Sequence, residues 1–252
     1  MNVIRKQIIM KELYEKKSVS VTNLSRDLDV STMTIRRDLK NLEKEGLVRV
    51  EHGGATLNGE ALFEFGMNIK QNENNIEKQR IAEKCLEYIN DGDIIFLDAG
   101  TTVLEIAKLL VNGRKITVVT NSLLVANILA AGGNQNFIMC PGKFRETSMA
   151  FMGQLTDAFI ANFKIDKMFL GVEGVSMSFG VSVPDIDDGT TKQCISKTAK
   201  KVICVADSEK FGKNWFYCIQ PLSEIDVIIT DDRIDSQVYN DYISNGVSII
   251  KV

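Results

Sequence analysis

The segment VSTMTIRRDLKNLEKEG, residues 30–46, constrains the fold of this chain more than any other. At about 100° of rotation per residue, Ile35, Leu39 and Leu42 share one stripe of a helix, and that stripe must be buried against other elements. Arginine and lysine side chains spread over the opposite face. The sequence therefore predicts an amphipathic helix with one apolar and one basic face.

Both ends of this helix are marked in the sequence. Ser31 can accept hydrogen bonds from the free N–H groups of the first turn, and Gly46 can adopt the positive φ that ends a helix. Asp38 and Glu45 are expected on a flank away from the arginines, which leaves the centre of the exposed face positive. Such a face suits the phosphate-lined groove of DNA. The alternative is a solvated charged helix, and the neighbouring segments argue against it.

The preceding segments supply partners for the apolar stripe. Residues 2–16 predict a first helix, and residues 21–28 predict a second one after a short β-leaning connection. The apolar face of the first helix is expected to contain Ile4, Ile8, Ile9 and Leu13. Two short helices, a tight turn and a third helix with a basic outer face indicate a helix-turn-helix.

A hairpin is predicted directly after the third helix. The segment LVRVEHGGATL has two β-leaning runs around Gly53 and Gly54, which is typical of a hairpin turn. A hairpin beside a recognition helix is a wing. Arg49 and His52 near its tip could touch the sugar–phosphate backbone, which adds affinity but little sequence information. A solvated hairpin without DNA contacts is the alternative.

The run VSTMTIRRDLKNLEKEGLVRVEHGGA resembles the winged helix of the DeoR family of bacterial transcriptional regulators, with its T-I-R-R-D-L helix and hGGA wing. In that family the domain binds operator DNA. The resemblance implies that Thr32, Thr34, Arg36, Arg37 and Lys40 face the major groove or its phosphates. The expected DNA-binding set is completed by Ser31 at the helix start and by Arg49, His52 and Gly53 in the wing.

Composition limits the class of protein. Of 252 residues, 44% are hydrophobic, and no apolar run approaches the ~20 residues of a membrane span. Without a signal-peptide pattern, a cytoplasmic protein with no membrane contact is expected. The net charge is −3, but the first 57 residues hold 11 Lys and Arg against 8 Asp and Glu. Only this part therefore carries the charge of a polyanion-binding protein.

No metal site and no cofactor are predicted. His52 is the only histidine, which excludes a centre with several histidine ligands. The five cysteines are scattered without a CxxC pair, so buried, reduced thiols are expected. They are Cys85, Cys140, Cys194, Cys204 and Cys218.

The chain is expected to form two domains, residues 1–57 and 77–252, joined by a polar, Asn-rich linker at 58–76. In the second domain, the apolar runs DIIFLDAG, KITVVTNS, NFIMCPG, IDKMFLGVEG, KVICVADS and DVIITDDR alternate with helical patterns. This rhythm predicts an α/β fold with a largely parallel sheet covered on both faces.

Ligands of such sheets bind beyond the carboxyl ends of the strands. In the run DAGTT, Asp98 follows a strand, Gly100 allows close backbone approach, and Thr101 and Thr102 open a helix whose free N–H groups favour an anion. An ordinary helix cap is the alternative. Polar residues also end three other strands, in TNS, FLGVEG and VADSEKFG, and these runs should meet at one edge.

The runs DAGTT, TNSLLVA, FLGVEGV and VADSEKFG, in that order, resemble the effector-binding domain of the DeoR family. That domain is similar in fold to ribose-5-phosphate isomerase and CoA transferases and binds phosphorylated sugars. Lys192, in DDGTTKQC, lies where the family usually carries an acidic residue followed by a lysine. The family more often shows D-S-S-K where this chain has Ser208, Glu209 and Lys210, so Glu209 adds a negative charge beside the expected phosphate-binding lysine. The expected pocket comprises Asp98, Gly100, Thr101, Thr102, Thr120, Asn121, Gly171, Glu173, Lys192, Asp207 and Lys210.

The resemblance implies a DNA-binding regulator, expected to repress a carbohydrate-utilisation operon, whose operator binding is modulated by a phosphorylated sugar or polyol. Activation is the open alternative. Because helix-turn-helix proteins usually bind two half-sites, a homodimer or homotetramer is expected. The competing hypothesis is a sugar-phosphate isomerase with Asp98, Glu173 or Asp207 as base. Isomerases carry D-G-A-D-E where this chain has FLGVEG, so no enzyme and no catalytic residue are predicted.

Overall fold

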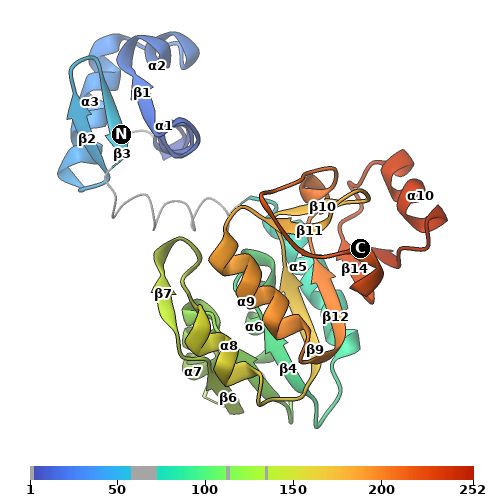
Figure 1. Ribbon diagram of the computed structural model, residues 1–252. Helices are drawn as coiled ribbons and strands as arrows, with labels where there is room; N and C mark the ends of the chain where they lie inside the picture. The colour runs from blue at the N-terminus through green and yellow to red at the C-terminus, as the bar shows by residue number, and fades with distance from the viewer. Residues whose placement is uncertain (1–2, 58–72, 112–113, 134–135) are drawn as a thin grey trace. The chain divides into compact units, whose positions relative to one another are not determined.

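The computed structural model describes residues 3–57, 73–111, 114–133 and 136–252 (Figure 1). They form two compact units, Met1–Glu73 and Asn74–Val252. Most of the expected linker, residues 58–76, lies outside the described residues, and the helix that opens the second unit begins at Asn75. No helix in the described ranges is long and apolar enough to cross a membrane.

Within residues 3–57, the first unit contains three helices and a small antiparallel sheet. The helices are α1 (Val3–Lys16), α2 (Val21–Asp27) and α3 (Thr32–Lys44). The strands are β1 (Ser18–Ser20), β2 (Val48–Glu51) and β3 (Gly54–Leu57), in the order β1-β3-β2. This arrangement is a helix-turn-helix followed by a β-hairpin wing, as the sequence predicts.

The core of this unit is built around α3. Its residues Ile35, Leu39 and Leu42 are fully buried, as predicted. On α1 the prediction was partly wrong, because Ile4 and Ile8 are exposed, 66% and 44%. The buried stripe of α1 instead contains Ile9, Met10 and Leu13.

Asp38 is not on an exposed flank of α3, as the sequence suggested, but fully buried. It lies three residues after Ile35 and four before Leu42, so the helical period places it on the packed face. Its carboxylate accepts a hydrogen bond from Arg5 Nε of α1 at 2.5 Å. This ion pair compensates for the burial of the charge.

The second unit is built on a seven-stranded parallel sheet, in the order β15-β14-β12-β9-β4-β5-β6. The strands are β4 (Ile94–Leu97), β5 (Thr117–Thr120), β6 (Asn136–Met139), β9 (Ile165–Gly171), β12 (Ala199–Val205), β14 (Val227–Thr230) and β15 (Ile249–Lys251). The alternating strand residues pack into two separate cores, one on each face. The predicted parallel α/β sheet with two covered faces is confirmed.

Helices cover both faces of this sheet. One core includes residues of α5 (Asn75–Cys85), α6 (Thr101–Leu110) and α7 (Leu123–Gly132). The other includes residues of α8 (Gln154–Ile160), α9 (Ile186–Ser196) and α10 (Ser236–Ser244). All five cysteines are free thiols, but Cys194 and Cys218 are only partly buried.

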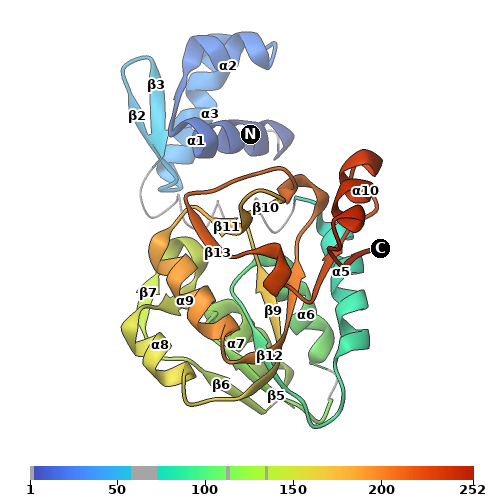
Figure 2. The ribbon, with the colours of Figure 1, turned by 45° about the vertical axis from the view of Figure 1, so that its right-hand side comes forward.

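Two antiparallel additions were not predicted. The strands β7 (Lys143–Arg145) and β8 (Ala150–Met152) form a hairpin. The strands β10 (Gly174–Ser176), β11 (Gly180–Val183) and β13 (Tyr217–Gln220) form a small sheet. Because β10 begins three residues after β9 ends, this sheet stands at the carboxyl end of the parallel strands (Figure 2). The unit also contains short 3₁₀-helices at Leu86–Tyr88, Glu146–Ser148, Ser208–Lys210 and Leu222–Glu224.

Candidate functional site

The exposed face of α3 and the wing border an open groove of about 1070 Å³. Arg36, Arg37 and Lys40 contribute to its wall from α3, and His52 and Gly53 contribute from the hairpin. These side chains come from two elements that meet because β2 follows α3 after a tight turn at Gly46, whose φ is +76°. The groove therefore joins the two parts of the first unit that the sequence assigned to DNA.

The basic side chains of this groove differ from the other cations of the unit in their partners. Within residues 3–57, the groove residues Arg36, Arg37, Lys40 and Lys44 are exposed and form no ion pair. Arg49 of the wing is also exposed and unpaired in this range, but it does not line the groove. Arg5, by contrast, pairs with buried Asp38. Unpaired cations concentrated along one groove provide a surface suited to a polyanion.

The start of α3 is capped as predicted. Ser31 Oγ accepts a hydrogen bond from the Thr34 backbone N–H at 3.2 Å, and the two hydroxyls lie 2.9 Å apart. Thr32 is exposed beside them. Ser31 thus has a structural task in addition to any contact with DNA.

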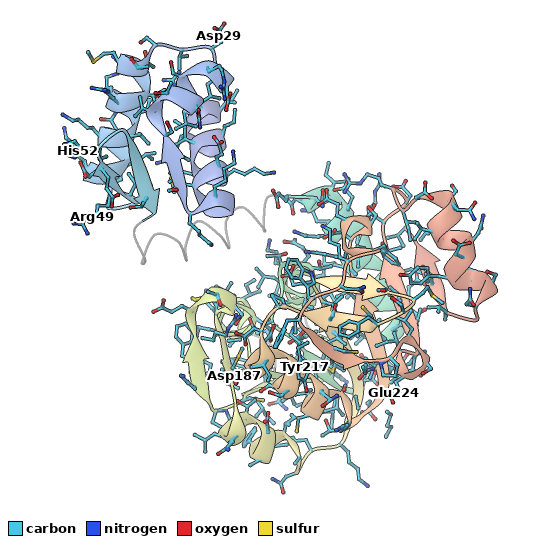
Figure 3. The ribbon with its side chains drawn as sticks, turned by 45° about the horizontal axis from the view of Figure 1, so that its top comes forward. Asp29, Arg49, His52, Asp187, Tyr217 and Glu224 are labelled. Atoms are coloured by element: carbon cyan, nitrogen blue, oxygen red, sulfur yellow. The ribbon has the colours of Figure 1, made fainter. Side chains whose placement is uncertain are left out.

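The wing turn lies one residue earlier than the sequence suggested. The two turn residues are His52 and Gly53, with φ of +85° at Gly53, and Gly54 already pairs with Glu51 in the hairpin. Figure 3 shows Arg49 and His52 on the outer side of the wing. Gly54 is instead buried, because β1 packs against it.

In the second unit, Asp98 is completely buried at the carboxyl end of β4. Its Oδ2 accepts hydrogen bonds from Lys192 Nζ at 2.5 Å and from the Gly171 N–H at 3.0 Å. Lys192, 3% exposed, also donates to the Gly171 carbonyl at 3.0 Å. These contacts bind the ends of β4 and β9 to α9, and Asp98 Oδ1 has no partner among the described residues.

Lys192 remains charged although it is buried. Burial alone would lower its pKa, but Asp188 and Asp98 raise it above the ordinary lysine value. Asp188 Oδ1 lies 3.7 Å from Lys192 Nζ. Asp188 was not among the expected site residues, and the DDG run before Lys192 was the signal that could have indicated it.

The N-terminus of α6 is open. Gly100 precedes the helix without a side-chain cap, and Thr101 is half-buried while Thr102 is buried. A Cβ at Gly100 would meet only Gly171 Cα, at 3.9 Å, which is an ordinary contact. Packing of the described atoms therefore does not require glycine here. No acceptor is found among the described residues for the backbone N–H groups of residues 101–103, the kind of group that can bind an anion.

The residues after β5 are mainly bonded within the protein. Thr120 Oγ1 donates to the Leu97 carbonyl at 2.7 Å, and Asn121 Nδ2 donates to the Phe151 carbonyl at 3.1 Å. Asn121 is 1% exposed, and its Oδ1 has no partner in the described part of the chain. This oxygen is the second unpaired buried acceptor at the same sheet edge as Asp98 Oδ1.

Beyond β9 and β12, Lys210 Nζ donates to Glu173 Oε2 at 2.8 Å. Burial alone would lower the pKa of Lys210, but Glu173 and Asp207 raise it. Asp207 begins the 3₁₀ turn Ser208–Lys210 and accepts a hydrogen bond from the Glu209 N–H at 3.2 Å. Burial raises the pKa of Asp207, and the nearby ammonium group of Lys210 partly offsets this.

The structure brings the expected ligand residues to one edge of the sheet, at the ends of β4, β5, β9 and β12. They differ in accessibility. Seven are buried: Asp98, Thr102, Thr120, Asn121, Gly171, Lys192 and Asp207. Four are partly accessible: Gly100, Thr101, Glu173 and Lys210.

Both units match models of known protein families. Residues 5–61 match the model of the DeoR-like helix-turn-helix domain, and residues 73–232 match that of the DeoR C terminal sensor domain. The chain is 32% identical over 246 residues to the HTH-type transcriptional regulator GlpR of Haloferax volcanii, covering 98% of this chain and 96% of that one. It is 33% identical over 213 residues to the glycerol-3-phosphate regulon repressor of Escherichia coli K12, covering 84% of each. Ribose 5-phosphate isomerase A of Methanocaldococcus jannaschii has 14% identity and a TM-score of 0.42 over 55% of each chain.

Proposed function

The chain belongs to the DeoR family of transcriptional regulators, and we propose that it represses an operon of carbohydrate metabolism under the control of a phosphorylated sugar or polyol. The observation that carries the proposal is the groove between α3 and the wing, with its unpaired cations. Two half-sites of an operator would be bound by a homodimer or homotetramer. The relatives named above are regulators, and no residue of this chain is assigned a catalytic role.

In this proposal α3 enters the major groove. Arg36, Arg37 and Lys40 meet base edges or phosphates, and Thr32 and Thr34 lie at the N-terminal end of the helix, where recognition helices contact bases. Ser31 fixes the helix start. Arg49, His52 and Gly53 of the wing contact the sugar–phosphate backbone.

Arg36→Ala is expected to lower operator affinity by about 1–3 kcal/mol, roughly tenfold to a hundredfold, because one cation of the groove is lost. Fluorescence anisotropy with operator DNA at several salt concentrations measures this, and the slope of log affinity against log salt should fall by about 1 if Arg36 meets a phosphate. Lys16→Ala is the matched control, since Lys16 is an exposed cation of α1 outside the groove. Equal losses of operator affinity in both variants would contradict the assignment of α3 as the DNA-recognition helix.

For the effector, we propose that the N–H groups at the start of α6 bind the phosphate group, with Thr101 donating a further hydrogen bond. Lys210 supplies a positive charge from the other side of the edge. The buried pair of Asp98 and Lys192 holds Gly171 in place, so these two residues act as positioning residues. Thr102, Thr120, Asn121, Glu173 and Asp207 complete the lining.

A phosphorylated sugar or polyol is expected to raise the melting temperature of the protein, because it binds only the folded state. The stabilisation is about 2.7 kcal/mol at a hundredfold excess over Kd. Thr101→Val should weaken binding about tenfold or more, since a hydrogen bond to a charged group contributes about 1.5–3 kcal/mol. A thermal-shift panel of sugar and polyol phosphates measures both effects.

The control for this experiment is Thr117→Val. Thr117 begins β5, at the opposite end of the parallel strands from the proposed pocket. Its substitution should leave the ligand-induced shift unchanged. If no phosphorylated compound raises the melting temperature of the wild type, the proposed effector site is wrong, and the residues near α6 serve only to maintain the fold.

A further inference from the structure

The turn that carries Lys210 is connected to the first helix of the second unit. That helix, α5, begins at Asn75, two turn residues after the segment 58–72, so it is the first helix described after that segment. A change in its N-terminal turn would reach this segment without passing through any other element.

Asp231, just beyond β14, is the centre of the connection. It is fully buried. Its Oδ2 accepts a hydrogen bond from the Ser208 N–H at 2.7 Å, and its Oδ1 accepts from Arg233 N at 3.0 Å and Arg233 Nε at 3.3 Å. Burial alone would raise the pKa of Asp231, but these N–H donors lower it, so the carboxylate is charged at neutral pH.

The second half of the connection leads to α5. Arg233 Nη1 lies 3.3 Å from Oε1 of Glu77, which is in the first turn of α5. The next residue, Lys78, is 4% exposed, and its positive charge lowers the pKa of Asp207, against the larger effect of burial. Glu77 in the N-terminal turn of α5 is thus linked to the Ser208 N–H through Arg233 and Asp231.

On its other side, the same turn is held by the Lys210–Glu173 ion pair. An anion that approaches Lys210 competes with Glu173 for the ammonium group, because both are negative. The structure shows the arrangement with Glu173 bound to Lys210, and an anion in its place would give the turn Ser208–Lys210 a second arrangement. Coupling between sites requires such a difference between states.

We propose that the turn Ser208–Lys210 transmits effector binding to the N-terminus of α5 through Asp231, Arg233 and Glu77. This inference rests on the proposed function, since it takes Lys210 to be a ligand residue. It assigns a role in regulation to three residues that contact neither the proposed effector nor DNA.

Hydrogen–deuterium exchange of the full chain tests the route, with inorganic phosphate at millimolar concentration as the probe and chloride at equal ionic strength as the reference. In the wild type, phosphate should alter exchange in peptides covering residues 207–211 and in peptides covering residues 75–85. In Arg233→Met, the response at 207–211 should persist and the response of α5 should be lost. Glu77→Gln should have the same effect, and the double variant should add nothing to either single one.

Arg80→Met is the matched control. Arg80 Nη1 lies 3.3 Å from Asp232 Oδ2, so this pair also joins α5 to the loop after β14. The two arginines are similarly exposed, 49% for Arg80 and 46% for Arg233, although Asp232 is more exposed than Glu77. No hydrogen bond between Asp232 and the turn Ser208–Lys210 is found among the described residues. Arg80→Met should therefore retain the response of α5 to phosphate.

The outcomes separate the inference from the proposed function. A normal α5 response in Arg233→Met would overturn the route, as would a wild-type response confined to residues 207–211. Loss of the α5 response in Arg80→Met as well would also overturn it, because general attachment of α5 would then be sufficient. If phosphate changes exchange at neither segment, the route is wrong, and the thermal-shift panel decides separately whether the proposed effector site at the start of α6 stands.

Discussion

Lys192→Met is expected to lower the free energy of unfolding of the second unit by about 3–5 kcal/mol, because it leaves the buried carboxylate of Asp98 without its cation. Asp98 is 0% exposed and would keep only the Gly171 N–H as a donor to Oδ2. The methionine side chain fills similar space, so the loss is electrostatic rather than steric. The variant also removes the hydrogen bond to the Gly171 carbonyl.

Urea unfolding followed by tryptophan fluorescence measures this loss. Trp215 is the only tryptophan of the chain and lies in the second unit, so the signal reports on that unit alone. Lys200→Met is the control, since Lys200 forms an exposed pair with Asp166, and water screens such pairs so that they add little to stability. The double variant Asp98→Asn, Lys192→Met should regain part of the stability, because the fully buried side chain at position 98 then carries no charge.

The difference in free energy of unfolding between the wild type and Lys192→Met should also be constant across neutral pH. The folded-state pKa of Lys192 is raised above its ordinary value by Asp188 and Asp98, against the effect of burial. Its stabilisation is therefore fully present below the ordinary lysine pKa and is lost only as the pH rises through the higher folded value. If the stability lost in Lys192→Met disappeared between pH 6 and 8, roughly one unit either side of neutrality, a group other than Lys192 would be titrating.

The local features of α3 could be predicted from the sequence because they depend on neighbouring residues. The cap at Ser31 and the positive φ at Gly46 are both present. Asp38 could not be placed correctly from its charge. Its burial depends on Arg5, which lies 33 positions earlier and reaches it only after α1 packs on α3.

The sheet edge shows the same limit. Asp98 was expected at the ligand edge because it follows a strand, and the structure places it there, but its main partner is Lys192, 94 positions later. No local pattern reveals that such a pair is buried. The helix α9 that carries Lys192 and the hairpin of β7 and β8 lie in runs whose patterns gave no structural prediction. Their formation depends on packing against the sheet, as the buried residues of α9 show.

Gly54→Ala is expected to have the second large effect, in the first unit. A Cβ at Gly54 would lie 2.0 Å from the Val19 carbonyl oxygen and 3.1 Å from its carbonyl carbon. Both are backbone atoms of β1, which pairs with β3 through Ser20 and Gly54. The strands must therefore separate, and we expect a loss of about 3 kcal/mol or more, at the upper end of the cost of overpacking.

This separation should also displace the wing. Val21 N donates to the Gly53 carbonyl at 2.8 Å, so a shift of β1 reaches the turn that carries His52. Operator affinity should fall even at temperatures where the unit stays folded. Hydrogen exchange of β1 and β3 and an operator titration of the same sample measure the two effects.

Gly46→Ala separates steric overlap from the general cost of replacing a glycine. Gly46 also has positive φ, +76°, but a Cβ there would meet nothing within 4 Å. Its cost should be only about 1–2 kcal/mol, from backbone strain. Equal losses of stability in the two variants would show that β1 can move away from a side chain at position 54 at little cost. The position of the wing would then not depend on close packing at Gly54. A larger loss in Gly54→Ala, with weaker operator binding, would mean that the hGGA run is needed for the packing of β1 as well as for the turn.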